Sequence, residues 1–487
     1  MSYGLAWLQN QNALRCILVE AVAKIAGVET TFYLSTRGYI TEAGEAPAST
    51  NYVPCIVGGL QITETLPLDG TASIAYGDIE IVNLDGSRDA WLDYVWANRS
   101  VKVYVGDVSW ARADFQLVFD GILEDIDSKN YDKLNLKIRD KLQRLNGPIS
   151  EAKLGTGDNP DSLIPLTFGE CCNVTPLLSN PATLEYQVHN GPIESIIEVR
   201  DNGVPVTGFT PSLATGKFTL TTAPAGIITC SIQGDKPSTY ANTVAATSQR
   251  IVKDFGKVSS RFVSGDLDSA NLSAFESANT QAIGVYLTAR ENIITIIQQL
   301  SSSIGAQATI TREGKFALLR IAFPPAGTPT DIGEADILVN SLHISDRPAV
   351  RASTKVGYCK NWTVQNNLLT GIPEEHKKLF YDEYFTITQT DGTVVTDYKL
   401  DIEPIQRDTL LLNTTEATAE ANRELDIYKT PRHVVSFDGF PQCLLLTLGQ
   451  AVTITHHRFG LEAGKTGVVV SLQTDWINFK VTAGVLL

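Results

Sequence analysis

Hydrophobic and polar residues alternate along much of the first third of the chain. Successive side chains of a strand point to opposite faces of a sheet, so this alternation predicts half-buried β-strands. Strands are expected at Arg15–Lys24, Thr30–Leu34, Ile79–Val82, Val101–Val105, Phe115–Phe119 and Leu134–Ile138, with a turn at Gly27. One short helix is expected after the Asp85-Gly86 turn, with Ser87 as its cap, Asp89 in its first turn, and Trp91, Tyr94 and Val95 on one face.

The rest of the chain mixes short strands, turns and helices. Gly155–Pro160 has the composition of a flexible connector, and turns then punctuate short strands at Ile196–Arg200 and Lys217–Thr221, which is typical of a small sandwich or barrel. Helical spacing follows at Gln249–Phe255, at Glu291–Leu300 (with Ile293, Ile294, Ile297 and Leu300 on one side) and at Asn413–Tyr428, where Asn413 and Glu416 form a capping pair. Further strands are expected at Gln307–Thr311, Phe316–Ile321, Arg351–Tyr358, Ala451–His456, Gly467–Leu472 and Phe479–Val485.

These patterns predict a mainly β fold with scattered helices (α+β) in several domains. At about 150 residues per domain, 487 residues suggest three or four domains. We place an N-terminal β module at residues 1–150, a small β-sandwich or barrel at 151–244, an α+β module at 245–345 and a C-terminal β module at 346–487.

Composition narrows the class of protein. The content of 43% hydrophobic and 19% charged residues is that of folded globular material. A net charge of −15 disfavours nucleic-acid binding by phosphate neutralisation. The cations between Lys129 and Arg144 are explained as the solvated face of a strand and its following turn. The chain has no apolar stretch of membrane-spanning length and no secretory signal at its start, so we expect synthesis in a reducing cytoplasm.

Searches for chemical motifs return no strong candidate. Phosphate-binding GxxxxGK[ST] and GxGxxG motifs, the GxSxG elbow and HExxH are absent from the sequence. The adjacent pair His456-His457 suggests a metal site, but neighbouring strand residues point to opposite faces, so a structural role is favoured. Glu124, Asp125 and Asp127 follow a predicted strand and suggest a glycosidase pair, or else merely solvated carboxylates.

The seven cysteines are scattered and odd in number, and two of them, Cys171 and Cys172, are adjacent. A vicinal pair suits redox chemistry or metal binding, but zinc ribbons need paired CxxC units that this chain lacks. Buried, reduced thiols are the favoured interpretation, with scattered iron–sulfur ligands left open.

Several segments, taken in order, resemble the tail-tip or baseplate hub proteins of long-tailed bacteriophages (siphophages) and related prophages. The resemblance spans nearly the whole chain, and its strength lies in the order of segments that are individually weak. The segments are Leu34–Tyr39, Tyr76–Glu80, Asp85–Asp89, Val118–Ile122, Leu136–Leu142, Pro165–Gly169, Tyr186–His189, Val356–Trp362 and Leu448–Val452.

The resemblance implies a structural virion protein rather than an enzyme. It implies a homotrimer at the phage tail tip that closes the tail tube, with two tube-like β modules per chain matching a six-fold ring and a small β domain inserted. The expected partners are the distal tail protein ring, the tape-measure protein and central fibre or other baseplate proteins, in host attachment and DNA ejection. Some relatives hold an iron–sulfur cluster, but no cysteine here is matched to such a ligand, so no cofactor, metal or catalytic residue is assigned.

Two alternatives remain open. A peripheral receptor- or carbohydrate-binding tail protein would stack sugars on its Trp and Tyr residues, although Trp91, Tyr94 and Trp96 are better explained as core or helix surface. A cell-wall hydrolase would use Glu124 and Asp125. The loops expected to contact partners are Thr41–Asn51, Gly155–Pro160 and Pro324–Pro329, although each is also explained as an unengaged surface loop.

Overall fold

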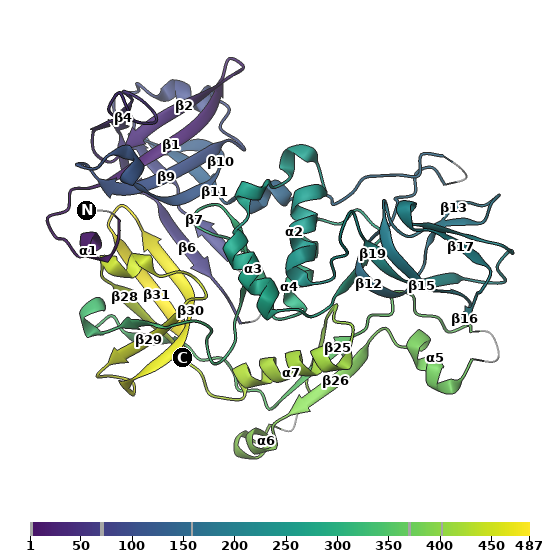
Figure 1. Cartoon of the computed structure of the whole chain (residues 1–487). Helices are drawn as coiled ribbons and strands as arrows, with labels where there is room; N and C mark the ends of the chain where they lie inside the picture. Colours follow the sequence, from purple (N-terminus) through teal and green to yellow (C-terminus); the bar gives the residue numbers. More distant parts are fainter. Residues whose placement is uncertain (1–2, 69–72, 157–158, 369–371, 401–402) are drawn as a thin grey trace. The chain divides into compact units, whose positions relative to one another are not determined.

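The computed structural model describes residues 3–68, 73–156, 159–368, 372–400 and 403–487 (Figure 1). The chain folds into two compact units, each assembled from separate stretches of sequence. Unit 1 consists of Met1–Arg144, Thr309–Ala349 and Pro431–Leu487, and unit 2 of Leu145–Ala308 and Val350–Thr430. The fold is mainly β with scattered helices, as predicted. The four modules proposed from sequence stay a prediction, because two units are a coarser division.

The first sheet of unit 1 has the strand order β3-β4-β2-β1-β9-β10-β11-β8-β5. Residues 26 and 27 form the turn between β1 and β2, and Gly27 has φ 91°, a left-handed conformation that favours glycine. All six strands predicted from alternation are confirmed. The strands are β1 (Arg15–Ile25), β2 (Val28–Ser35), β3 (Tyr39–Ile40), β4 (Asn51–Pro54), β5 (Ile56–Gly59), β8 (Ile79–Val82), β9 (Ser100–Asp107), β10 (Gln116–Asn130) and β11 (Lys133–Arg139).

The predicted helix after Asp85-Gly86 is only a short 3-10 helix, η1 (Asp89–Asp93). Ser87 does not cap it, so that prediction was wrong. Instead, Asn83 Oδ1 accepts from the backbone N of Arg88, and Ser87 bonds Asp85. A local side-chain bond has replaced the cap and shortened the helix.

The second sheet of unit 1 combines strands from opposite ends of the sequence. Its order is β23-β29-β30-β31-β28-β24, and β6 pairs with both β30 and β7. Figure 1 shows the purple strands β6 and β7 beside the yellow C-terminal strands. The strands are β6 (Gln61–Thr65), β7 (Ser73–Tyr76), β23 (Thr330–Ile332), β24 (His343–Asp346), β28 (Val434–Gly439), β29 (Ala451–His456), β30 (Leu461–Asp475) and β31 (Lys480–Leu486).

One hydrophobic core joins the two sheets of unit 1. Val103 and Leu136 enter it from the first sheet, and Phe437 and Val469 enter it from the second; all four are completely buried. Trp7 on the short helix α1 (Leu5–Leu8) belongs to the same core. The beginning and end of the described chain are therefore packed into a single unit.

Unit 2 contains a two-layered β module, consistent with the predicted sandwich. One sheet has the order β16-β15-β19-β12-β20 and the other β13-β14-β18-β17. Val199 and Ile232 of the first sheet share a core with Tyr186 and Phe218 of the second. The strands are β12 (Leu166–Val174), β13 (Leu177–Asn180), β14 (Glu185–Gln187), β15 (Ile193–Asp201), β16 (Val204–Pro205), β17 (Phe209–Ser212), β18 (Lys217–Leu220), β19 (Ile228–Asp235) and β20 (Gly284–Leu287).

The remaining part of unit 2 holds the longer helices and a sheet of order β26-β25-β27, on which α7 packs. Asn413 caps α7 as predicted, whereas Glu416 accepts from the backbone N of Ala282. On α4 the buried side includes Ile296, while Ile294 is only half-buried. The elements are α2 (Val244–Asp254), α3 (Ser269–Ala278), α4 (Ile293–Ser302), β25 (Ser353–Tyr358), α5 (Glu374–Tyr381), β26 (Phe385–Thr390), α6 (Gly392–Tyr398), β27 (Gln406–Asp408) and α7 (Thr414–Tyr428). The boundary between the two units falls within β21 (Ala306–Ile310), and its partner β22 (Phe316–Arg320) belongs to unit 1.

Within the described ranges, no helix combines the length and the apolar composition needed to cross a bilayer.

Candidate functional site

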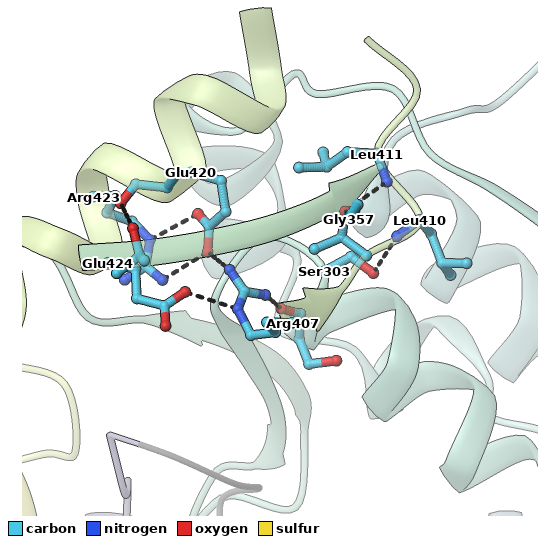
Figure 2. Close-up of polar contacts among 12 residues, drawn as sticks. Ser303, Gly357, Arg407, Leu410, Leu411, Glu420, Arg423 and Glu424 are labelled. Carbon is cyan, nitrogen blue, oxygen red and sulfur yellow. Dashed lines mark hydrogen bonds and ion pairs between the residues drawn. The ribbon is translucent and has the colours of Figure 1, made fainter. Parts of the chain in front are cut away.

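A network of charged side chains links helices and strands in the helical part of unit 2 (Figure 2). Glu420 on α7, with only 2% of its side chain exposed, accepts hydrogen bonds from two arginines. Nη2 of Arg407 and Nη2 of Arg423 lie 2.6 Å and 2.7 Å from Glu420 Oε1. Nε of Arg407 also donates to Glu424 Oε2 at 2.8 Å. Two carboxylates thus face two guanidinium groups, which satisfies the requirement that buried charge be paired.

The network also fixes backbone from distant parts of unit 2. Nη1 of Arg407 donates to the carbonyl oxygen of Ser302, at the end of α4, at 2.8 Å. Beside it, Ser303 Oγ accepts from the backbone N of Leu410 at 3.0 Å, and Thr409 Oγ1 donates to the Gly357 carbonyl at 2.7 Å. Figure 2 shows Ser303, Gly357, Arg407 and Glu420 close together, although they come from α4, β25, β27 and α7 or the turns beside them. The cluster therefore holds four elements of unit 2 in place.

The charge state of this network does not suit acid–base catalysis. Burial lowers the pKa of Arg423, but the hydrogen bonds to Glu420 together with the charges on Glu420 and Glu424 outweigh that effect and hold the pKa above its ordinary value. A catalytic acid or base must exchange protons near the working pH. We conclude that the network is suited to holding the fold together.

The adjacent histidines lie closer together than strand geometry predicts. We expected His456 and His457 to point to opposite faces, but β29 ends at His456 after an irregularity in its pairing with β30. The two rings stack with their centroids 4.4 Å apart, so that expectation was wrong. With Glu334 they form one group of three potential metal-binding side chains, whose ligand atoms lie within 4.8 Å of one another.

The polar atoms of this group already bond one another. Glu334 Oε1 accepts from the backbone N of His457 and lies 2.7 Å from His457 Nδ1. His456 Nδ1 accepts from the backbone N of Arg458 at 3.1 Å. The hydrogen bonds from His457 lower the pKa of Glu334. The group lies at an exposed position, and the expectation that these residues hold no metal stays a prediction.

His189 is the buried histidine of the sandwich module, with a 1% exposed side chain. Its Nδ1 accepts from the backbone N of Thr167 at 3.0 Å, and its Nε2 lies 3.2 Å from Asp235 Oδ1. Arg250 Nε donates to the other oxygen of Asp235 at 2.7 Å. Burial raises the pKa of Asp235, but the hydrogen bonds from His189 and Arg250 lower it by more. Both nitrogens of His189 are engaged, which indicates a structural role.

The three carboxylates considered for glycoside chemistry lie within a strand and not after one, because β10 extends beyond them. Arg139 on β11 forms a two-pronged ion pair with Glu124, with Nε to Oε2 at 2.7 Å. Lys137 Nζ lies 2.8 Å from Asp127 Oδ2 and lowers the pKa of that carboxyl. A glycosidase acid needs a raised pKa. The pair with Lys137 shifts the pKa of Asp127 in the opposite direction, Glu124 is held in its ion pair, and Asp125 is exposed.

The cations between Lys129 and Arg144 take part in similar pairs. Lys133 Nζ lies 2.7 Å from Glu80 Oε2, and Lys141 Nζ lies 2.9 Å from Asp120 Oδ2. Lys129 pairs with Asp78. Their charge is balanced locally, as the interpretation of a solvated strand face predicted.

The aromatic residues considered for sugar stacking pack against one another. The Trp91 ring lies 4.8 Å from that of Phe32, and Trp96 is 1% exposed with its Nε1 donating to the Trp91 carbonyl at 2.8 Å. Tyr94 stacks on Phe32 at 6.0 Å. This arrangement gives the aromatic cluster a packing role.

The vicinal cysteines have different environments. Cys171 is completely buried in the sandwich core with Cys230, and burial raises the pKa of both thiols. Cys172 is only partly buried and lines a pocket of about 410 Å³, where its Sγ lies 3.9 Å from Cys359 Sγ. Asn173, Asn361 and Phe380 line the same pocket. The contact between Cys172 and Cys359 was not predicted. The two residues are 187 positions apart, and no local sequence pattern links them.

These positions do not fit an iron–sulfur cluster, for which four thiolates are the usual ligands. Cys171 and Cys172 are neighbours on β12, and only the second reaches the pocket. Cys359 is the one other cysteine there, while Cys230 faces the apolar core. The pocket thus offers two thiols.

Two of the loops expected to bind partners are described completely. Within Thr41–Asn51, Thr41 Oγ1 accepts from the backbone N of Thr50 at 2.7 Å, and Glu45 Oε1 accepts from that of Arg112 at 2.6 Å. Pro324–Pro329 is largely exposed. Residues 157 and 158 of Gly155–Pro160 lie outside the described residues. Partner binding by these loops stays a prediction.

The sequence matches no protein-family model and no curated protein sequence. Solved structures do show similarity. The 43 kDa tail protein of prophage MuSo2 from Shewanella oneidensis aligns with a TM-score of 0.42 and 11% identity over 97% of this chain and 98% of its own. The tail protein from Neisseria meningitidis MC58 aligns with a TM-score of 0.41 and 10% identity over 97% and 96%. The E. coli c3393 protein, a component of the type VI secretion system, aligns with a TM-score of 0.34 and 7% identity over 89% and 73%. The structural neighbours of this chain include prophage tail proteins and a secretion-system component.

Proposed function

We propose that the chain is a structural component of a long bacteriophage tail and forms the trimeric hub of its baseplate or tail tip. In this role it closes the tail tube and contacts the distal tail ring and the tape-measure protein. It also carries fibre or other baseplate proteins, and it acts in host attachment and DNA ejection by presenting surfaces, without catalysis.

The observation that carries this proposal is the pairing of two large sheets within unit 1. One has nine strands and the other eight, and one core serves both. The resemblance in the sequence implies two tube-like β modules in each hub subunit. The two sheets of unit 1 match that number, one sheet for each module. Three chains would then offer six modules, which matches the symmetry of a six-fold ring.

Assembly also needs surface that a single chain leaves uncovered. The edge strand β24 is exposed along its whole length, and an edge strand offers unpaired backbone groups to a neighbour. Tyr131, at the tip of the β10–β11 hairpin, is 93% exposed. We assign β24 to contacts between subunits and the hairpin tip to contacts with other tail proteins.

The first test is the mass of the purified chain in solution, measured by light scattering at several concentrations. A stable trimer supports the hub, and incorporation into tails during phage assembly is the second requirement. A chain that stays monomeric and never joins the tail would overturn the proposal. Zymography on peptidoglycan, with Glu124→Gln as the matched variant, separates this role from that of a hydrolase.

A further inference from the structure

Two of the seven cysteines meet in unit 2 although 187 positions separate them. Cys172 lies on β12, and Cys359 follows β25. Backbone contacts hold the two segments side by side without help from the thiols: Cys172 forms a parallel bridge with Asn361, and the backbone N of Trp362 donates to the Cys172 carbonyl at 3.3 Å. The fold therefore fixes the two sulfur atoms near each other.

These two thiols are also the accessible ones. Cys172 and Cys359 are only partly buried and line the pocket of about 410 Å³, whereas the other five cysteines are fully buried. Thiol reactions require access as well as a thiolate. A small solute entering the pocket would reach this pair before any other cysteine.

The pair contains its own nucleophile. The contact between the two sulfur atoms lowers the pKa of the Cys359 thiol, against the opposing effects of burial and of the charge on Glu170. The same contact raises the pKa of Cys172. The contact favours one ionised thiol in the pair, and we assign the attack to Cys359 and the resolving step to Cys172.

We propose that Cys172 and Cys359 form an oxidisable dithiol site whose substrate is a low-molecular-weight disulfide such as oxidised glutathione. The Cys359 thiolate attacks one sulfur of the small disulfide, and one glutathione thiolate leaves. Cys172 then loses its proton and attacks Cys359 Sγ in the mixed disulfide, and the second glutathione thiolate leaves. The two protein thiols give up two electrons and two protons in total, and the small disulfide becomes two glutathione thiols.

The product is a disulfide within unit 2 that links β12 to the segment after β25. The sulfur atoms must approach from 3.9 Å to about 2.05 Å. A link between residues far apart in sequence restricts the unfolded chain strongly. Oxidation should therefore raise the thermal midpoint of unit 2. This inference does not depend on the tail role, because it needs only the isolated chain.

The test is to incubate the native full chain with oxidised glutathione, block the remaining thiols and map the peptides by mass spectrometry. We expect one cross-linked pair containing Cys172 and Cys359, with no glutathione retained and a higher thermal midpoint than the reduced chain. In Cys172→Ser, glutathione should stay attached to Cys359, and the increase in midpoint should disappear. Cys443→Ser, which removes a buried thiol, should cross-link like the unaltered chain.

Three results would overturn the proposal. One is the absence of a cross-link in the native chain when the unfolded chain reacts fully with the same reagent. Another is cross-linking that involves the buried cysteines equally. The third is glutathione that stays on Cys359 while Cys172 is intact. Circular dichroism of the Cys172→Ser and Cys359→Ser variants establishes that they are folded, so that loss of the cross-link reports on chemistry.

Discussion

The two units bring distant parts of the chain together by different means. Unit 1 joins its three stretches through strand pairing and one apolar core that runs between two sheets. The helical part of unit 2 joins α4, β27 and α7 through Arg407, Glu420 and their neighbours. Apolar packing is non-directional and tolerates small adjustments, whereas paired buried charges require both partners. The comparison predicts that the units respond to different kinds of substitution.

The largest effect is expected from Phe437→Ala. Phe437 is completely buried in the core shared by the two sheets of unit 1. Removing a buried phenyl ring leaves a cavity and costs about 4 kcal/mol of folding free energy. Hydrogen exchange should show the loss of protection in unit 1. Equal loss in unit 2 would break the comparison, because it would mean that the units do not respond separately.

Glu420→Ala should destabilise unit 2 by about 3 kcal/mol, because it leaves two guanidinium groups without their shared partner. The effect lies at the lower end of the usual range, since 30% of the Arg407 side chain remains exposed to water. Hydrogen exchange of α7 and β27 is the measurement. Glu374→Gln, which removes an exposed ion pair with Lys377 on α5, is the matched control and should cause no measurable change. If Glu420→Ala left hydrogen exchange of α7 and β27 unchanged, the structural role given to the network would be contradicted.

Asp235→Asn tests whether ionic contacts stabilise unit 2, because the effect of this substitution on stability should depend on pH. The folded pKa of Asp235 is depressed, so its ionised form stabilises unit 2 above the unfolded value of about 3.9, and that stabilisation is lost as the pH falls through the folded pKa. The variant should therefore melt at a lower temperature than the unaltered chain at pH 7. The difference between them should narrow below about pH 4. Thermal midpoints measured across this range decide the matter, and a difference that does not depend on pH would argue against the ionic role.

The smallest effect is expected from Gly27→Ala. Gly27 has φ 91° and open space around its Cα, so an added methyl group meets no atom and only the backbone conformation opposes it. A destabilisation of about 1 kcal/mol follows. Gly38→Ala is the control, since that position also has open space but lacks the left-handed backbone. Denaturant unfolding of both variants gives the comparison, and equal effects would remove the conformational explanation.

Local patterns predicted the strands well, because a half-buried strand carries its own signature of alternation. Segments 101–105 and 134–138 are examples. The prediction of a helix capped by Ser87 was wrong. The Asn83 side chain accepts a hydrogen bond from the backbone N of Arg88 at the point where the first helical turn would begin. The helix α3 was not predicted because its amphipathic pattern is weak, with Leu272 and Phe275 as its buried apolar residues.

The candidate sites were harder to predict than the strands. Glu420 and Arg423 were not singled out from the sequence, because charged residues are common on the solvated face of a helix. The approach of Arg407 from another element makes them part of a buried network. Cys172 was noticed for its neighbour Cys171, although its partner is Cys359. Each of these contacts depends on tertiary pairing between segments that share no local signal.

The pairing of β6 with β30 has a consequence for how the protein is made. Gln61 faces Asp475 across this pair, 414 positions later in the chain. During translation, the hairpin of β6 and β7 must therefore wait for its neighbour until the ribosome has read past codon 475. A product released before that point would lack the strand that completes the second sheet and would expose an unpaired edge. The sheet also needs β31, which pairs with both β30 and β28, so a chain that ends before these two strands is expected to be unable to close unit 1.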